Sequence, residues 1–194
     1  FLKSPNFSLI TAVASECDYP VTYGGGLKHI EDIDKIFNCG VEKVSFQSTF
    51  FEKRHIVEQT ADKYGNQSVV ISIDYTKDKN HNYKLYLNSS KILETKIETL
   101  VKSASEFGEV FVMATHKEGT RSGPDIDLIN QIAPHISCPL IYGGGVSNIN
   151  DMYKVFEAGA DAVGVGAMFV FHGIHNAVLL SYPTAKDREL AGFI

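Results

Sequence analysis

The chain has 194 residues, a formal net charge of −5 and 44% hydrophobic residues, values typical of one globular domain. Its acidic balance, without basic runs, argues against a nucleic-acid-binding or membrane-surface protein. The longest apolar run, near residues 162–171, is too short and too glycine-rich to span a bilayer, and no signal-peptide pattern opens the chain. We therefore expect residues 1–194 to form a single cytoplasmic domain.

The hydrophobic pattern alternates between short apolar runs and helical stripes along the chain. A small hairpin is expected in the segment 75–90, where "YKLYL" alternates between polar turns. The predicted helices cover about residues 6–18, 91–107, 125–133 and 148–158. The predicted strands cover about residues 20–23, 43–47, 68–74, 110–115, 139–142 and 162–166.

Two segments of the chain, 20–50 and 139–169, are copies of one another. They align without a gap at an offset of 119, and 12 of their 31 positions are identical, including the triple glycines 24–26 and 143–145. Each copy predicts a strand, a glycine turn, a helix and a second strand. This pattern indicates an internal duplication.

Strands that alternate with helices predict a parallel sheet. If the offset of 119 residues is half of a symmetric fold, the whole falls in the size range of a (β/α)₈ barrel made of duplicated half-barrels. Six strand–helix units are visible, so we expect a barrel domain that is incomplete at its amino end by about one and a half units. An open arc of six strands would expose apolar edges, which favours missing residues over a six-stranded protein.

The duplicated glycine turns are the strongest functional signal. In such barrels the chemistry lies at the carboxyl ends of the strands, and successive backbone N–H groups in a glycine turn can bind an anion. Two copies half a barrel apart predict a ligand with a phosphate at each end. The alternative is that the glycines only make tight turns. The candidate phosphate-binding residues are Gly25, Gly26, Gln47 and Ser48 in the first copy, and Gly144, Gly145, Gly166 and Ala167 in the second.

Several runs resemble the cyclase (synthase) subunit of imidazole glycerol phosphate synthase, from that family's third strand onward. They are "YPVTYGGGLKHIEDIDKIFNCGVEKVSFQS", "YGNQSVVISIDYT", "HKEGTRSGPDIDLI" and "CPLIYGGGVSNINDMYKVFEAGADAVGVGAMF". The resemblance implies a (β/α)₈ barrel that receives ammonia from a glutaminase partner and acts on a small substrate phosphorylated at both ends. It also implies one phosphate at Gly26, Gln47 and Ser48, and the other at Gly144, Gly145, Gly166 and Ala167.

Two departures from the family pattern matter. The family uses two catalytic aspartates, one on a first strand that this chain does not show and one in a pattern like S-x-D-x-D-G-T. Residues 114–120 read "ATHKEGT", so His116 occupies that aspartate position, and Gln47 stands where the family usually has asparagine. The tail 169–183 resembles a divergent branch that accompanies sugar amidotransferases in bacterial surface-polysaccharide synthesis.

Two residues are candidates for catalysis. His116 could act as general acid or base, since imidazole titrates near neutral pH; alternatively, this copy has lost cyclase chemistry. Asp74 ends a strand and so points toward the carboxyl-end opening, where either an acid–base role or a capping role suits it. His172 and His175 have metal-ligand spacing but no third ligand, so we expect no metal and no cofactor.

The three cysteines, Cys17, Cys39 and Cys138, show no metal-ligand spacing, and we expect buried, reduced thiols. None lies where a strand ends, so the chain should hydrolyse no glutamine itself. The resemblance implies a separate glutaminase on the amino-terminal face, with ammonia passing along the barrel axis. Two functions remain open: an ammonia-dependent synthase subunit, or a non-catalytic barrel that binds a phosphorylated ligand and supports an amidotransferase.

Overall fold

A computed structural model describes residues 5–87, 91–93, 95–172, 175 and 177–190. The strands are β1 (Thr22–Gly24), β2 (Lys43–Phe46), β3 (Val69–Lys77), β4 (Tyr83–Leu87), β5 (Lys91–Leu93), β6 (Glu109–Ala114), β7 (Leu140–Gly143), β8 (Ala162–Gly164), β9 (Phe171–His172) and β10 (Ala177–Val178). The helices are α1 (Phe7–Glu16), α2 (Ile30–Asn38), α3 (Ser48–Glu52), α4 (Arg54–Tyr64), α5 (Ile97–Ala104), α6 (Ile126–Ile132), α7 (Ile149–Glu157), α8 (Ala167–Val170) and α9 (Ala185–Leu190). Short 3₁₀ turns are η1 (Asn66–Ser68), η2 (Thr115–Lys117) and η3 (Ala133–His135).

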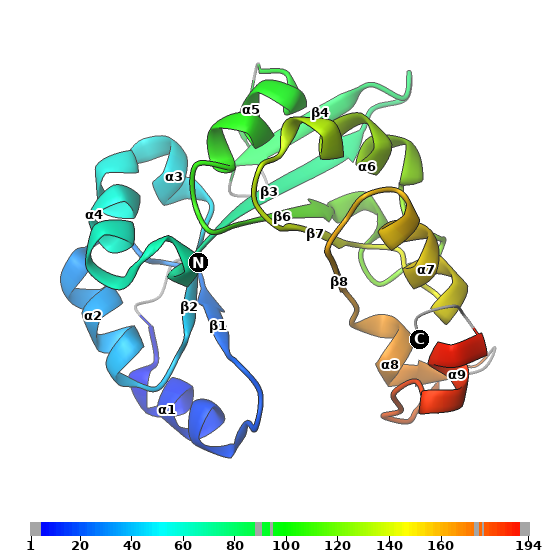
Figure 1. Ribbon diagram of the computed structural model, residues 1–194, viewed down its shortest axis with the longest axis horizontal. Helices are drawn as coiled ribbons and strands as arrows, with labels where there is room; N and C mark the ends of the chain where they lie inside the picture. Colours follow the sequence, from blue (N-terminus) through cyan, green and yellow to red (C-terminus); the bar gives the residue numbers. More distant parts are fainter. Residues whose placement is uncertain (1–4, 88–90, 94, 173–174, 176, 191–194) are drawn as a thin grey trace.

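Six strands form one curled parallel sheet in the order β1-β2-β3-β6-β7-β8. Figure 1 shows this sheet as an open arc, with helices such as α2, α4, α5 and α7 on its convex side. Because the strands are parallel, all their carboxyl ends lie at one edge of the sheet, which we call the mouth. The predicted (β/α)-barrel class is confirmed. Within the described residues β1 and β8 each lack a second neighbour and do not pair with one another.

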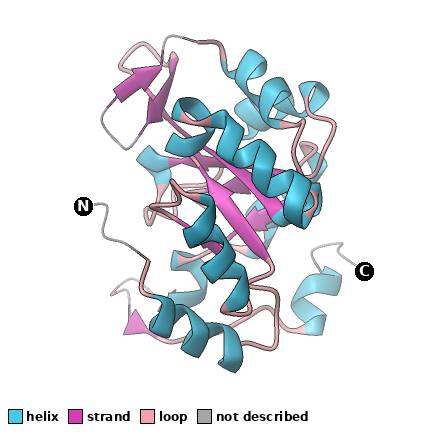
Figure 2. Ribbon diagram, turned by 90° about the vertical axis from the view of Figure 1, so that its left-hand side faces the viewer, coloured by secondary structure: helices cyan, strands magenta, loops and turns pink. Residues whose placement is uncertain are grey.

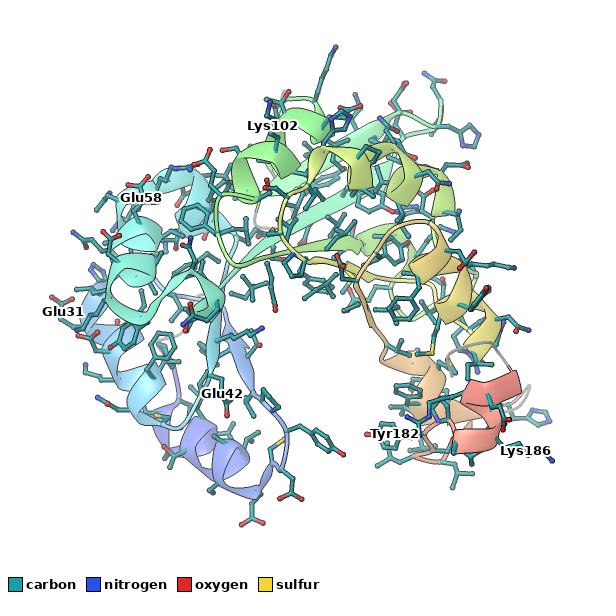
Figure 3. The ribbon with its side chains drawn as sticks, in the orientation of Figure 1. Glu31, Glu42, Glu58, Lys102, Tyr182 and Lys186 are labelled. Carbon is teal, nitrogen blue, oxygen red and sulfur yellow. The ribbon has the colours of Figure 1, made fainter. Side chains whose placement is uncertain are left out.

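The core lies between the sheet and the outer helices. Along β6, Val110, Val112 and Ala114 are buried against helices, whereas Phe111 and Met113 alternate toward the concave side. Figure 2 shows the strands in magenta with cyan helices packed around them. Charged side chains of the outer helices, among them Glu31, Glu58 and Lys102, point away from the arc into solvent (Figure 3). No helix among the described residues is both long and apolar enough to cross a membrane.

The duplication seen in the sequence is reproduced in the backbone. Helices α2 and α7 have bounds that differ by the same 119 residues. The φ angles of Gly25 and Gly144 are 116° and 106°, and those of Gly26 and Gly145 are 72° and 82°. These left-handed values are open to glycine at no steric cost, so each copy needs glycine to make the same turn.

The segment after β3 differs from the prediction in two respects. The hairpin is present, but its first arm is the end of β3 itself, where Asp74 to Lys77 pair with β4. The helix predicted over 91–107 begins only at Ile97, because 91–93 form β5 and pair with β4. Local helical periodicity therefore gave way to strand pairing. Residues 88–90 of the predicted hairpin lie outside the described residues.

Candidate active site

The first glycine turn joins β1 to α2 and borders a cavity of about 260 Å³ at the mouth, which we call the first glycine cavity. Thr49 is buried in α3, and its hydroxyl donates to the carbonyl of Leu27, which ties the start of α3 to the turn. The cavity is lined by Gly24, Gly25, Gly26, Leu27, Ser45, Phe46, Gln47, Ser48, Thr49, Ser72 and Asp74. All four predicted phosphate-binding residues of the first copy therefore meet at one cavity, together with Asp74.

The second glycine turn joins β7 to α7 and borders a cavity of about 440 Å³, which we call the second glycine cavity. A Cβ at Gly145 would lie 2.4 Å from the carbonyl oxygen of Gly123, whose N–H donates to the Gly145 carbonyl at 2.8 Å. Only glycine fits so close an approach. The lining includes the four predicted residues Gly144, Gly145, Gly166 and Ala167, together with Met113, Glu118, Gly119, Arg121, Val146, Gly164, Val165, Val170 and Phe171.

The two cavities share one further feature, the residue that precedes the short helix after each second strand. Gln47 has φ −118° and ψ −83°, and Gly166 has φ −118° and ψ −75°. The backbone therefore enters α3 and α8 in the same conformation, although the residue types differ. The predicted phosphate role of these residues stays a prediction; their convergence on two equivalent cavities at one mouth supports it.

Asp74 lies on β3, between the strands that carry the two cavities, and its side chain lines the first. Burial raises the pKa of its carboxyl group above the ordinary value. A hydrogen bond from Gln47 opposes this shift of the Asp74 pKa, whereas the negative charge of Glu118 adds to it. A carboxyl group with a raised pKa is suited to exchange protons near neutral pH.

His116 lies in η2 and lines a separate hollow with Thr76, Tyr86 and Thr115, beside the β3–β4 hairpin. Its ring packs edge-on against Tyr75, with centroids 5.6 Å apart. Partial desolvation of the ring, and then the charge of Lys117, lowers the pKa of His116, so the neutral imidazole is favoured. The structure thus does not bring His116 into either glycine cavity, and its catalytic role stays a prediction.

Glu118 and Arg121 are the functional candidates that the sequence analysis missed. Both line the second glycine cavity, and Arg121 donates to the Phe171 carbonyl at 2.8 Å. Burial is the main cause of the raised pKa of Asp74, and the negative charge of Glu118 adds to it. The signal was available in "HKEGTR", two and five residues after the residue aligned with the family's aspartate.

The amino-terminal end of the barrel interior is polar. Lys43, the first residue of β2, forms an ion pair with Glu109, the first residue of β6. Their side chains are 29% and 19% exposed. Both positions alternate with buried outward-facing residues, so they face the concave side of the sheet. An ion pair therefore lies at the bottom of the interior, at the end opposite to the glycine turns.

The cysteines lie away from both glycine cavities. Cys17 and Cys39 follow the ends of α1 and α2, and Cys138 precedes β7. All three are free, but Cys17 is exposed and the other two are only partly buried, so the expectation of buried thiols is wrong. The short loops in which they lie leave one side open to solvent. The described residues contain no cluster of three or more metal-ligating side chains.

A family model described as "Histidine biosynthesis protein" matches residues 3–175. A Pseudomonas aeruginosa protein, provisionally named imidazole glycerol phosphate synthase subunit hisF2, is 38% identical over 192 residues, covering 97% of this chain and 76% of the relative. A Leptospira interrogans protein, provisionally named subunit HisF of the same enzyme, is 33% identical over 192 residues, covering 96% and 76%. Subunit HisF of imidazole glycerol phosphate synthase from Dictyoglomus thermophilum is 32% identical over 166 residues, covering 84% and 66%.

Proposed function

Since the chain belongs to the histidine biosynthesis protein family, we propose that it is a synthase (cyclase) subunit of the imidazole glycerol phosphate synthase type. In this proposal it uses ammonia from a glutaminase partner to convert a sugar-derived substrate phosphorylated at both ends. The observation that carries the proposal is the pair of equivalent glycine turns that border two cavities at one mouth. Successive backbone N–H groups in a glycine turn can bind an anion, which supports the proposal.

In this proposal each part of the mouth has a role. The two glycine cavities hold the phosphate groups, and the reacting part of the substrate lies across β3, which carries Asp74. Asp74 exchanges a proton with the reacting centre as general acid or base. Burial keeps the pKa of Asp74 raised, and the negative charge of Glu118, just after η2, adds to this shift. Fixed groups of this kind lower a barrier by positioning and by proton transfer.

The origin of the nitrogen is tested with the cysteines. We expect no glutamine hydrolysis by the full-length protein alone, because none of the three cysteines, all of them described, lines either glycine cavity. Ammonium salts should support turnover without a partner, and glutamine should do so only when a glutaminase subunit is added. The variant with Cys17, Cys39 and Cys138 replaced by serine should keep ammonia-dependent turnover. Glutaminase activity in the purified chain, unchanged in that variant, would contradict the proposal.

The Lys43–Glu109 ion pair supports a route for ammonia along the barrel interior. Barrel interiors are normally filled by apolar side chains, so a charged pair at the amino end provides polar groups along that route. Replacing Lys43 by methionine leaves Glu109 unpaired. We expect a changed ratio of glutamine-dependent to ammonia-dependent turnover, by about threefold or more. An unchanged ratio would argue against this route.

A second candidate function is a non-catalytic barrel that binds a phosphorylated ligand and supports a sugar amidotransferase in polysaccharide biosynthesis. The observation that favours it is His116, which stands where the family pattern has aspartate and faces a hollow apart from both glycine cavities. His116→Ala separates the two functions in part. If His116 is catalytic, turnover falls by about 10²-fold or more; if it is not, turnover is unchanged. A full-length wild-type protein that binds a bisphosphate without any turnover would establish the second candidate.

A further inference from the structure

Asp125 is a carboxylate buried behind the second glycine turn, with 4% of its surface exposed. The Tyr75 hydroxyl donates to Oδ2 at 3.2 Å, and Lys77 Nζ donates to Oδ1 at 3.0 Å. Both partners come from the end of β3, where the strand becomes an arm of the hairpin. Burial raises the pKa of Tyr75, which keeps its hydroxyl protonated and able to donate. A buried carboxylate persists only when it is paired in this way.

Asp125 also connects to the strand that leads into the second glycine turn. Its backbone N–H donates to the Tyr142 hydroxyl at 2.8 Å. Tyr142 lies on β7, is fully buried and directly precedes Gly143. One residue therefore links the hairpin arm, the start of α6 and the strand beneath the turn.

The loop between η2 and Asp125 contacts the second glycine turn. The N–H of Gly123 donates to the Gly145 carbonyl at 2.8 Å, and Lys117 Nζ donates to the Gly123 carbonyl at 2.9 Å. With its carbonyl held by Gly123, the turn has its orientation fixed. The same loop carries Glu118 and Arg121 into the second glycine cavity.

Comparison of the two halves of the duplication shows how Asp125 differs from its counterpart. At the offset of 119, Pro5 and Asn6 correspond to Pro124 and Asp125. The Asn6 side chain caps α1 by accepting from the Leu9 N–H at 3.2 Å. The Asp125 side chain makes no such bond to α6 and binds Lys77 and Tyr75 instead. Asn6 thus caps a helix in the first half, whereas its counterpart Asp125 in the second half binds side chains of β3.

We propose that Asp125 is a positioning residue for the second glycine turn: through Lys77, Tyr75 and Tyr142 it holds the loop that fixes Gly145 for a phosphate group. The inference rests on the proposed function only in taking phosphate as the ligand of that turn. It predicts a selective effect, because within the described residues none of the hydrogen bonds of this network reaches the first glycine turn.

The test uses inorganic phosphate as probe and the full-length protein labelled for backbone amide NMR. Shifts of Gly144 and Gly145 report the second turn, and those of Gly25 and Gly26 report the first. Asp125→Asn should weaken phosphate binding at the second turn by about tenfold and leave the first within about twofold. Asn6→Ala, which removes only the cap at the equivalent position, should change neither affinity by more than about twofold.

A purely structural role is distinguished by a double variant. Asp125→Asn leaves Lys77 without its carboxylate, and Lys77→Met removes that unpaired charge. The double variant should regain thermal stability but not phosphate affinity at the second turn. If the double variant regains both thermal stability and phosphate affinity, the proposal is overturned. Equal weakening of phosphate binding at both turns in Asp125→Asn would also overturn it. If Asp125→Asn does not fold, Tyr142→Phe takes its place. It should weaken phosphate binding at the second turn in the same selective way. Unchanged phosphate binding at both turns would overturn the proposal.

A ligand-free readout separates this inference from the proposed function. The Gly123 amide, which donates to Gly145, should exchange with solvent about tenfold faster in Asp125→Asn. If wild-type protein binds phosphate at neither turn, the proposed function fails, and Gly123 exchange still decides whether Asp125 holds the loop. If Asp125→Asn leaves both the exchange of the Gly123 amide and phosphate binding at the second turn unchanged, the positioning role of Asp125 is refuted.

Discussion

Replacing Asp74 with asparagine should lower ammonia-dependent turnover of the doubly phosphorylated substrate by about 10²–10⁴-fold, the range that a positioned general acid or base contributes. Asparagine has the same shape but exchanges no proton, so KM should change little. The measurement is kcat and KM with ammonium salts in full-length protein. Asp62→Asn, on the exposed side of α4, is the matched control and should retain full turnover. A kcat within about threefold of wild type for Asp74→Asn would remove Asp74 from the mechanism.

The same variant should be more stable than wild type at neutral pH. Burial raises the pKa of Asp74 in the folded protein above its ordinary value of 3.8. Between those two pKa values the folded state holds more protons than the unfolded state, so the free energy of unfolding falls as pH rises. Asparagine cannot ionise, so the variant does not lose this unfolding free energy as pH rises. Thermal unfolding of wild type and Asp74→Asn between pH 4 and pH 8 measures the difference. An unfolding free energy that falls equally in both would show that Asp74 is not the group responsible.

Replacing Gly145 with alanine should weaken phosphate binding at the second glycine turn and destabilise the protein. The φ of 82° costs an alanine about 1–2 kcal/mol. The added methyl would also meet the Gly123 carbonyl oxygen at 2.4 Å, so the loop must move and the Gly123–Gly145 hydrogen bond is lost. We expect phosphate affinity at the second turn to fall by at least about tenfold.

The control for this change is Asn150→Ala, an exposed residue within α7 just after the turn. It should leave phosphate affinity and stability nearly unchanged. Chemical denaturation gives the loss of stability, and amide NMR titration gives the affinity at each turn. If Gly145→Ala binds phosphate at the second turn as tightly as wild type, the turn is not the anion site.

Much of the architecture could be predicted from the sequence, because the sequence contains an internal repeat. The offset of 119 between the triple glycines fixed the equivalence of β1 with β7 and of α2 with α7, and the backbone of both copies agrees with it. Alternation of short apolar runs with helical stripes was enough to predict a parallel sheet, whose strand ends necessarily share one edge. The convergence of Gly25 with Gln47, and of Gly145 with Ala167, followed from that topology.

The sequence by itself thus determined the duplicated barrel type, the shared mouth and the two glycine cavities, because periodicity and repeat spacing are local properties of the chain. Only the tertiary structure decided which loop residues enter the site. It placed Glu118 and Arg121 at the second glycine cavity and His116 in a separate hollow, since the direction of a loop side chain depends on hydrogen bonds from distant segments. The Asp125 junction shows the same dependence: its partners Tyr75 and Lys77 are 50 and 48 residues away, and no local pattern pairs them.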